Sequence, residues 1–252
     1  MQHGFNEPFI LNKNLKYKFK NYFCDYVYLS KSRTHAIYLK KKNLVKNYIV
    51  VKNKDQKFIN FKKKIDILIT LNAIGDKGGN SILSNNLSLK FAKICSEKFL
   101  NSKIIIRCHP SMNSYEFIYN YFNKNNLKIS ENIIIQNPIL SSDLSSDIKT
   151  CKIGFFYGGS SLLLDSINNL VIPIVCTNQG IYDLSYLKEK KVILTFSKFN
   201  LGYKIINNLM HNDILKDKIL KNINIFNRTH FYNRSNNNDI SKVIKNYINT
   251  KF

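Results

Sequence analysis

Residues 103–110 read KIIIRCHP, and residues 152–165 read KIGFFYGGSSLLLD. In each stretch, a short apolar run stops abruptly, at Pro110 in the first and at a pair of glycines in the second. The runs do not alternate with polar residues, which is typical of strands covered by helices on both faces. We therefore expect two buried parallel strands, each followed directly by polar residues that are available for function.

The same succession of short apolar runs continues on both sides of these stretches. Apolar runs alternate with helical patterns, which predicts an α/β fold with a doubly wound parallel sheet. The expected strands are 25–30, 48–52, 65–71, 103–107, 133–136, 152–157, 171–176 and 191–196. The expected helices are 31–42, 81–100, 114–125, 143–150, a helix opening at 158–161 and ending at 169, 202–210, 213–225 and 239–250.

The composition indicates a folded chain without disulfides. Of its 252 residues, 44% are hydrophobic and 13% aromatic, enough to form a core. The five cysteines are odd in number and never spaced as C-x-x-C, so they favour core positions in a reducing cytosol over a disulfide framework or a zinc site. No apolar run is long enough to span a membrane, and the start does not resemble a signal peptide.

The net charge of +23 attracts phosphate groups of any kind. Lysine greatly outnumbers arginine, and asparagine and isoleucine are also abundant, a bias that an AT-rich genome would produce without selection for binding. The lysines form no stripe interleaved with aromatic residues, which disfavours a specific nucleic-acid partner. The partner that this charge favours is an anionic membrane, which the chain would contact peripherally.

A doubly wound sheet binds ligands beyond the carboxyl ends of its strands, and the chain places glycines and polar residues there. Gly78 and Gly79 follow the strand at 65–71, where a backbone can approach a ligand closely. Gly158, Gly159, Ser160 and Ser161 follow the strand at 152–157 and open a helix, where N–H groups and hydroxyls suit a phosphate. An ordinary serine N-cap explains the same residues without a ligand.

Other candidates follow the remaining strands. His109 could donate to a phosphate or protonate a leaving group, or be a solvated loop histidine. Arg107 could bind phosphate through its planar fork, or hold a nearby carboxylate. Asp165 could face a ribose or be a solvated helix residue. Gln136 and Asn137 could meet a nucleotide base, whereas His35, His211 and His230 are expected at the surface, and Phe226 is expected to pack a terminal helix.

The motifs KIIIRCHP and YGGSSLLLD (157–165) resemble the HP and SS motifs of bacterial sialyltransferases and polysialyltransferases. They are also similar to those of CDP-glycerol glycerophosphotransferases, and the similarity covers most of residues 65–200. These families imply a GT-B fold, a CMP- or CDP-activated donor, and no metal or other cofactor in catalysis. The resemblance implies that His109 contacts the donor phosphate or assists its departure, and that Ser160 and Ser161 hold the phosphate.

The resemblance also divides the chain. It implies a remnant of an acceptor-side domain at 1–55, a linker at 56–64, a nucleotide-sugar-binding domain at 65–225 and a helical tail at 226–252. His3-Gly4 resembles the His-Gly element of the CDP-glycerol enzymes, in which the histidine acts as base, so His3 is a second catalytic candidate. Residues 1–55 match only a small part of an acceptor-binding domain. The acidic element that sialyltransferases carry as a base has no counterpart in the sequence.

The hypothesis that follows is a glycosyltransferase, or a glycerophosphotransferase-like enzyme, that uses a CMP- or CDP-activated donor in bacterial surface polysaccharide synthesis. The partners would be the donor and a polysaccharide or lipid-linked acceptor, at the cytoplasmic face of the membrane. Two alternatives stay open. One is a UDP-sugar transferase or epimerase of the same fold, and the other is a nucleotide-binding module without catalytic activity.

Overall fold

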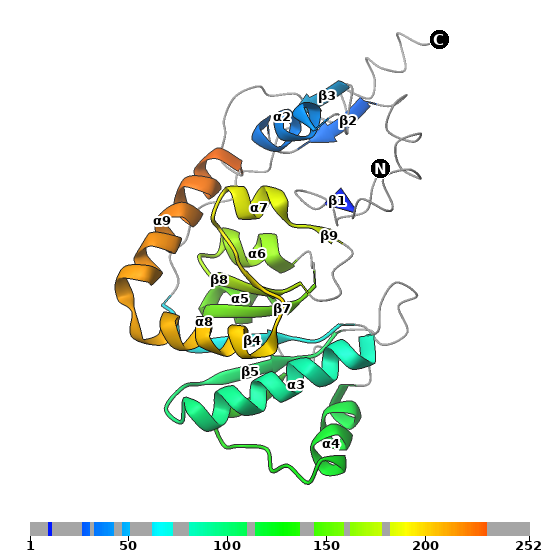
Figure 1. Cartoon of the computed structure of the whole chain (residues 1–252), viewed down its shortest axis with the longest axis vertical. Helices are drawn as coiled ribbons and strands as arrows, with labels where there is room; N and C mark the ends of the chain where they lie inside the picture. The colour runs from blue at the N-terminus through cyan, green and yellow to red at the C-terminus, as the bar shows by residue number, and fades with distance from the viewer. Residues whose placement is uncertain are drawn as a thin grey trace.

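The computed structural model describes residues 10–11, 27–30, 33–42, 47–50, 62–72, 81–109, 114–136, 144–158, 162–177 and 182–230. Its centre is a six-stranded sheet in the order β10-β8-β7-β4-β5-β6, with every pair parallel (Figure 1). The strands are β4 (Ile65–Thr70), β5 (Ile104–Arg107), β6 (Ile133–Gln136), β7 (Cys151–Tyr157), β8 (Ile172–Cys176) and β10 (Leu194–Phe196). The predicted parallel α/β sheet is confirmed.

Helices cover both faces of this sheet. Helix α3 (Ser81–Lys98) contacts β4, β5 and β7, and it packs beside α4 (Ser114–Lys124) and α8 (Phe199–His211). Helices α5 (Leu144–Thr150) and α6 (Leu162–Asn168) contact each other, and α5 lies against β4 and β7. Helix α9 (Asp213–His230) follows α8 and contacts α6 and β8.

The core follows from the alternation of side chains along the central strands. Ile67 and Ile69 of β4 belong to the large apolar cluster that contains Phe91 of α3, whereas Leu68 packs in a second cluster with Ile148 of α5. Successive residues of a strand point to opposite faces, so one uninterrupted apolar run serves two helical layers. This explains why residues 67–69 of β4 are all apolar.

A second, smaller unit precedes the large sheet. Strands β2 (Val27–Ser30) and β3 (Asn47–Val50) pair in parallel and are joined by α2 (Arg33–Lys41), so they form a βαβ unit. Short strands β1 (Ile10–Leu11) and β9 (Tyr182–Asp183) pair antiparallel. The sequence did not predict β1, β9 or α7 (Ser185–Glu189).

The βαβ unit is joined to the large domain through Tyr186 of α7. Its ring lies 4.9 Å from that of Tyr38 in α2, and its hydroxyl is 3.2 Å from Thr34 Oγ1 and 3.4 Å from His230 Nδ1. His230 is buried and stacks on Phe226 at 4.6 Å between ring centroids. The prediction that His230 lies at the surface is therefore wrong, and α9 continues to His230 instead of ending at Ile225.

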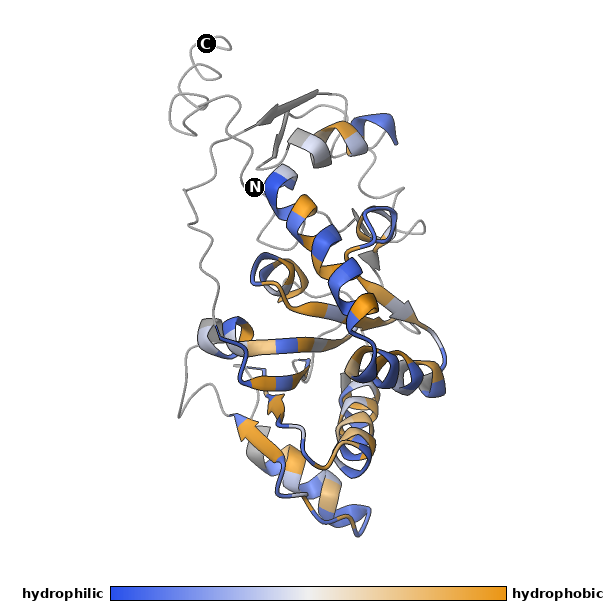
Figure 2. Ribbon diagram, turned by 90° about the vertical axis from the view of Figure 1, so that its left-hand side faces the viewer, coloured by the Kyte–Doolittle hydropathy of each residue, from blue (hydrophilic) through white to orange (hydrophobic). Residues whose placement is uncertain are grey.

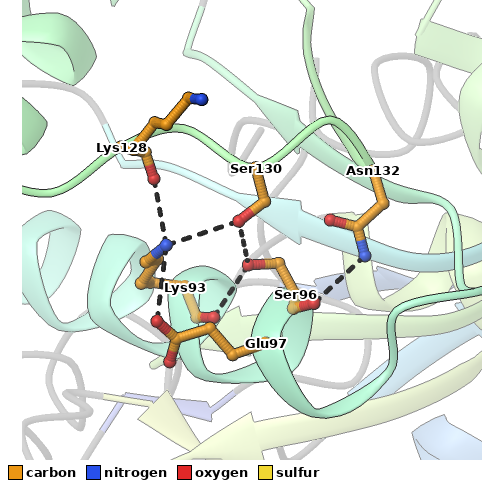
Figure 3. Close-up of polar contacts among 6 residues, drawn as sticks. All are labelled: Lys93, Ser96, Glu97, Lys128, Ser130 and Asn132. Carbon is orange, nitrogen blue, oxygen red and sulfur yellow. Dashed lines mark hydrogen bonds and ion pairs between the residues drawn. The ribbon is translucent and has the colours of Figure 1, made fainter.

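Polar contacts fix the carboxyl end of α3 to the segment that enters β6 (Figure 3). Asn132 Nδ2 donates to the carbonyls of Ser96 and Phe99, and the Ser96 hydroxyl is 3.0 Å from that of Ser130. Lys93 Nζ donates to the Lys128 carbonyl and lies 3.4 Å from a Glu97 carboxylate oxygen. The two bonds from Asn132 satisfy carbonyls that the end of α3 leaves without partners.

Cys95, Cys108, Cys151 and Cys176 are buried and free, which confirms their predicted core positions. Burial raises the pKa of the Cys95 and Cys151 thiols to about 12. No helix among the described residues is both long and apolar enough to cross a membrane. Cys24, His35 as a side chain and the predicted helix at 239–250 lie outside the part of the chain that the structure describes.

Candidate functional site

The strand order identifies one edge of the sheet as the candidate ligand site. From β4 the chain proceeds to β5 and β6 on one side, then returns to place β7 and β8 on the other side of β4. The direction of winding therefore changes between β4 and β7. In doubly wound sheets, ligands bind beyond the carboxyl ends of the strands at this switch point.

Hydrogen bonds keep this edge ordered for one residue beyond the strands. Leu71 N donates to Arg107 O at 2.9 Å, and Gly158 N donates to Cys176 O at 2.8 Å. Thr177 continues the pattern, since its N–H and its hydroxyl both donate to Phe196 O, at 2.9 and 3.2 Å. The residues that follow each strand therefore start from fixed positions.

Asn72, two residues after the end of β4, lies at the switch point and was not among the candidates from the sequence. Its N–H donates to Asn85 Oδ1 at 2.8 Å, and Asn85 Nδ2 donates back to Asn72 O at 2.9 Å. Its own Nδ2 lies 3.1 Å from Ser84 Oγ and 3.5 Å from the Tyr157 carbonyl. The side chain thereby connects the end of β4 with α3 and with the end of β7.

Gly158 lies across the switch point from Asn72, at the end of β7. It is buried and has a φ of 73°, a backbone conformation that favours glycine because it has no Cβ. The sequence predicted a tight turn here, and the structure shows its first residue in the left-handed region.

His109 follows β5 and is half-buried at the same edge of the sheet. One strand, β4, separates it from Gly158, so the two strand ends lie about 10 Å apart at ordinary strand spacing. The sequence predicted that His109 and the Gly-Gly-Ser-Ser turn each follow a strand of one sheet. In the sheet His109 and Gly158 share an edge, but Asn72 and β4 lie between them.

Arg107 is buried and forms an ion pair with Asp147 of α5, whose carboxylate accepts a hydrogen bond from the guanidinium. Of the two roles that the sequence left open, the structure thus shows the second, in which Arg107 holds a carboxylate. The pair joins β5 to α5 on one face of the sheet. A phosphate contact by Arg107 stays a prediction.

Two weaker candidates lie at the rim of the edge. Asp165 of α6 is an exposed residue. Partial loss of water around its carboxyl group nevertheless raises the pKa of Asp165 above the ordinary value. Gln136 ends β6, where its carbonyl accepts a hydrogen bond from Cys108 N at 3.3 Å. Contacts of Asp165 with a ribose and of Gln136 with a base stay predictions.

Several predicted site residues lie outside the described part of the chain. They are His3, Gly78, Gly79, Asn137, Gly159, Ser160 and Ser161. Residues 73–80 follow Asn72 and residues 159–161 follow Gly158, and Asn72 and Gly158 flank the switch point.

The described residues contain no cluster of three or more His, Cys, Asp or Glu side chains suited to a metal ion. What the edge offers instead is a histidine, amide groups and a left-handed glycine. The N–H groups of Asn72 and Gly158 already donate within the protein, so the ring of His109 is the group at this edge whose chemistry suits an anionic ligand.

Comparison with known proteins shows which solved structures have a similar fold. No family model matches the sequence, and no curated protein matches it. Among solved structures, TarM is 14% identical with a TM-score of 0.50, over 94% of this chain and 46% of TarM. A point mutant of S. aureus TarM, in complex with fondaparinux, alpha-GlcNAc-glycerol and UDP, is 11% identical with a TM-score of 0.50, over 88% of this chain and 43% of that one.

A third similar structure is the spinosyn forosaminyltransferase SpnP, at 9% identity and a TM-score of 0.52, over 81% of this chain and 51% of SpnP. The chain therefore spans about half the length of these structures. At such identities the likeness concerns the fold. The fold is the Rossmann-like α/β fold of GT-B glycosyltransferases, which confirms the predicted fold class.

Proposed function

We propose that the chain provides the donor-binding part of a glycosyltransferase, and that the nucleotide-activated donor binds at the carboxyl edge of β4, β5 and β7. The observation that carries this proposal is the pair Asn72 and Gly158 on either side of the switch point. Ligands of doubly wound sheets bind there, and the solved structures with this fold include glycosyltransferases.

In this proposal His109 supports the departure of the nucleotide. Negative charge develops on the leaving phosphate, and a positioned donor lowers the energy of that state. Asn72 gives residues 73–80 a fixed starting point, because its backbone is held at both its N–H and its carbonyl. Gly158 starts the turn that brings Ser160 and Ser161 to the phosphate.

The motifs HP and SS support a CMP- or CDP-activated donor and an acceptor in a surface polysaccharide. A UDP-activated donor is the second candidate, because a TarM structure with this fold holds UDP. Both candidates use the same edge, and they differ in the nucleotide base, which this proposal places near Gln136.

Thermal unfolding of the purified chain with CMP, CDP or UDP tests the proposal. A ligand at about a hundred times its Kd stabilises a protein by about 2.7 kcal/mol, which shifts the Tm of a chain of this size by roughly 5–10 °C. We expect such a shift with a cytidine nucleotide, and we expect His109→Ala to reduce it. His211→Ala is the matched control, since this exposed histidine ends α8 away from the edge.

Stabilisation by UDP alone would replace the cytidine donor by the second candidate. No shift with any of the three nucleotides, or an equal loss of the shift in His109→Ala and His211→Ala, would overturn nucleotide binding at this edge.

A further inference from the structure

Helix α9 carries an exposed stripe directly opposite its buried face. Its buried residues are Ile219, Ile223, Phe226, Asn227 and His230. At 3.6 residues per turn, Ile214, Lys218, Lys221, Ile225 and Arg228 fall within an arc of roughly 80° on the other side. The core therefore cannot explain why isoleucines occupy this stripe.

The two isoleucines are among the most exposed large apolar residues of the described chain. Ile214 is 83% exposed and Ile225 is 53% exposed, and they lie about 16 Å apart along the helix axis. Figure 2, in which this side of the molecule faces the viewer, shows hydrophobic segments separated by hydrophilic ones along α9.

Basic side chains lie between and beside the isoleucines. Lys218 and Lys221 separate them, and Arg228 follows Ile225 by three residues. The acidic residues of the helix are Asp213, which is ion-paired with Lys216, and Asp217, which flanks the stripe. The stripe itself therefore carries three positive charges and no negative one.

A third exposed apolar residue, Leu100, directly follows a phenylalanine that lies close to the end of α8. Leu100, just beyond α3, is 75% exposed, and the neighbouring Phe99 lies 6.4 Å from His211 between ring centroids. His211 ends α8, three residues before Ile214. Figure 1 shows the carboxyl end of α3 beside the corner where α8 meets α9.

We propose that this surface, formed by Leu100, Ile214, Lys218, Lys221, Ile225 and Arg228, docks on an anionic phospholipid bilayer. Lysine and arginine attract lipid phosphates, and isolated aliphatic side chains between them enter the boundary between headgroups and acyl chains. The net charge of +23 brings the chain to such a surface, and the stripe determines which side faces it. The proposal does not depend on the glycosyltransferase function.

The absence of tryptophan from the sequence allows a direct test. Ile214→Trp introduces the only tryptophan at the proposed contact, and Tyr119→Trp places it on α4 as the control, at a residue that is 45% exposed. With vesicles of equal parts phosphatidylcholine and phosphatidylglycerol, we expect a blue shift of the emission for Ile214→Trp and none for Tyr119→Trp. No shift for Ile214→Trp, or equal shifts for both, would overturn the proposal.

Vesicle flotation of charge variants tests the basic part of the stripe. Lys218→Ser combined with Lys221→Ser should weaken binding roughly thirtyfold, because each basic residue near an anionic surface contributes about 1 kcal/mol. Lys124→Ser combined with Lys128→Ser is the matched control, with the same change in charge at exposed positions elsewhere. Equal losses in the two pairs would show nonspecific attraction and overturn the docking surface. Binding to duplex DNA without binding to the vesicles would assign the stripe to a nucleic acid instead.

Discussion

The side chain of Asn85 holds both backbone groups of Asn72: its Oδ1 accepts from Asn72 N at 2.8 Å, and its Nδ2 donates to Asn72 O at 2.9 Å. Asn85 is fully buried in α3, whereas Asn72 is the last described residue of the β4 edge before loop 73–80. An amide can form this reciprocal pair because it presents a donor and an acceptor side by side. The pair therefore fixes the backbone of Asn72 at this edge of the sheet.

Asn85→Asp should weaken both folding and nucleotide binding. The carboxylate keeps the acceptor but loses the donor, and it would face the Asn72 carbonyl without a hydrogen bond. Leaving a buried polar group without its partner costs about 1–3 kcal/mol. Denaturant unfolding would measure this loss, and Asn86→Asp, at the half-buried next position, is the control. Equal effects of the two substitutions would show that the pair does not matter.

The buried pair Arg107–Asp147 leads to a second prediction, which separates its structural role from a phosphate contact. Removing one partner leaves a buried charge, so Arg107→Met or Asp147→Leu should each destabilise by about 3–5 kcal/mol. The double variant should be more stable than either single variant, because it buries no lone charge.

Nucleotide affinity of that double variant then decides the role of Arg107. The observed ion pair predicts that the affinity stays close to that of the wild type, as measured by calorimetry at a temperature where both are folded. A large loss of affinity in the double variant would show that Arg107 also contacts the phosphate.

The strands could be predicted from the sequence because each is a short, continuous apolar run that stops at a proline, glycine or polar residue. Strand β6 was placed at its observed bounds, and β4, β5, β7 and β8 within one residue at each end. The order of the strands was not predictable in this way. It is set by which faces pack together, and it placed β4 between β5 and β7.

The site was predicted only as far as local patterns carry information. His109 and Gly158 were found because each follows an apolar run, and they do lie at one edge. Asn72 was missed because its role depends on Asn85, 13 residues further along the chain. His230 was wrongly placed at the surface, because its polar neighbours Asn227 and Thr229 hid its position on the buried face of α9.

Lys63 supplies a third prediction, on pH. Its ammonium group donates to Lys149 O at 3.0 Å and to Asn169 O at 2.6 Å, at the carboxyl ends of α5 and α6. Burial lowers the pKa of Lys63 from 10.5 to about 8. Between pH 8 and 10.5, the unfolded chain therefore binds more protons at this residue than the folded one. The contribution of Lys63 to stability should rise with pH across that window.

The measurement compares wild type with Lys63→Met by denaturant unfolding at pH 7.5 and pH 10. The advantage of the wild type should be larger at pH 10, because the neutral amine still donates to both carbonyls and no charge stays buried. Lys64→Met, at the exposed neighbouring position, should show no such change. An advantage that shrinks as the pH rises would contradict the assignment.

The hydroxyl of Tyr186 gives the last prediction, on the junction between α2, α7 and α9. It lies 3.2 Å from Thr34 Oγ1 and 3.4 Å from His230 Nδ1, while the ring packs between Tyr38 and Phe226. Tyr186→Phe keeps the ring and removes only the polar link, so it should destabilise by about 1 kcal/mol. Because the link reaches α2 from the large domain, hydrogen exchange should accelerate in residues 33–42 and stay unchanged in α3. Tyr203→Phe, on α8, is the control, and acceleration of equal size in both variants would show that the Tyr186 hydroxyl does not hold the βαβ unit.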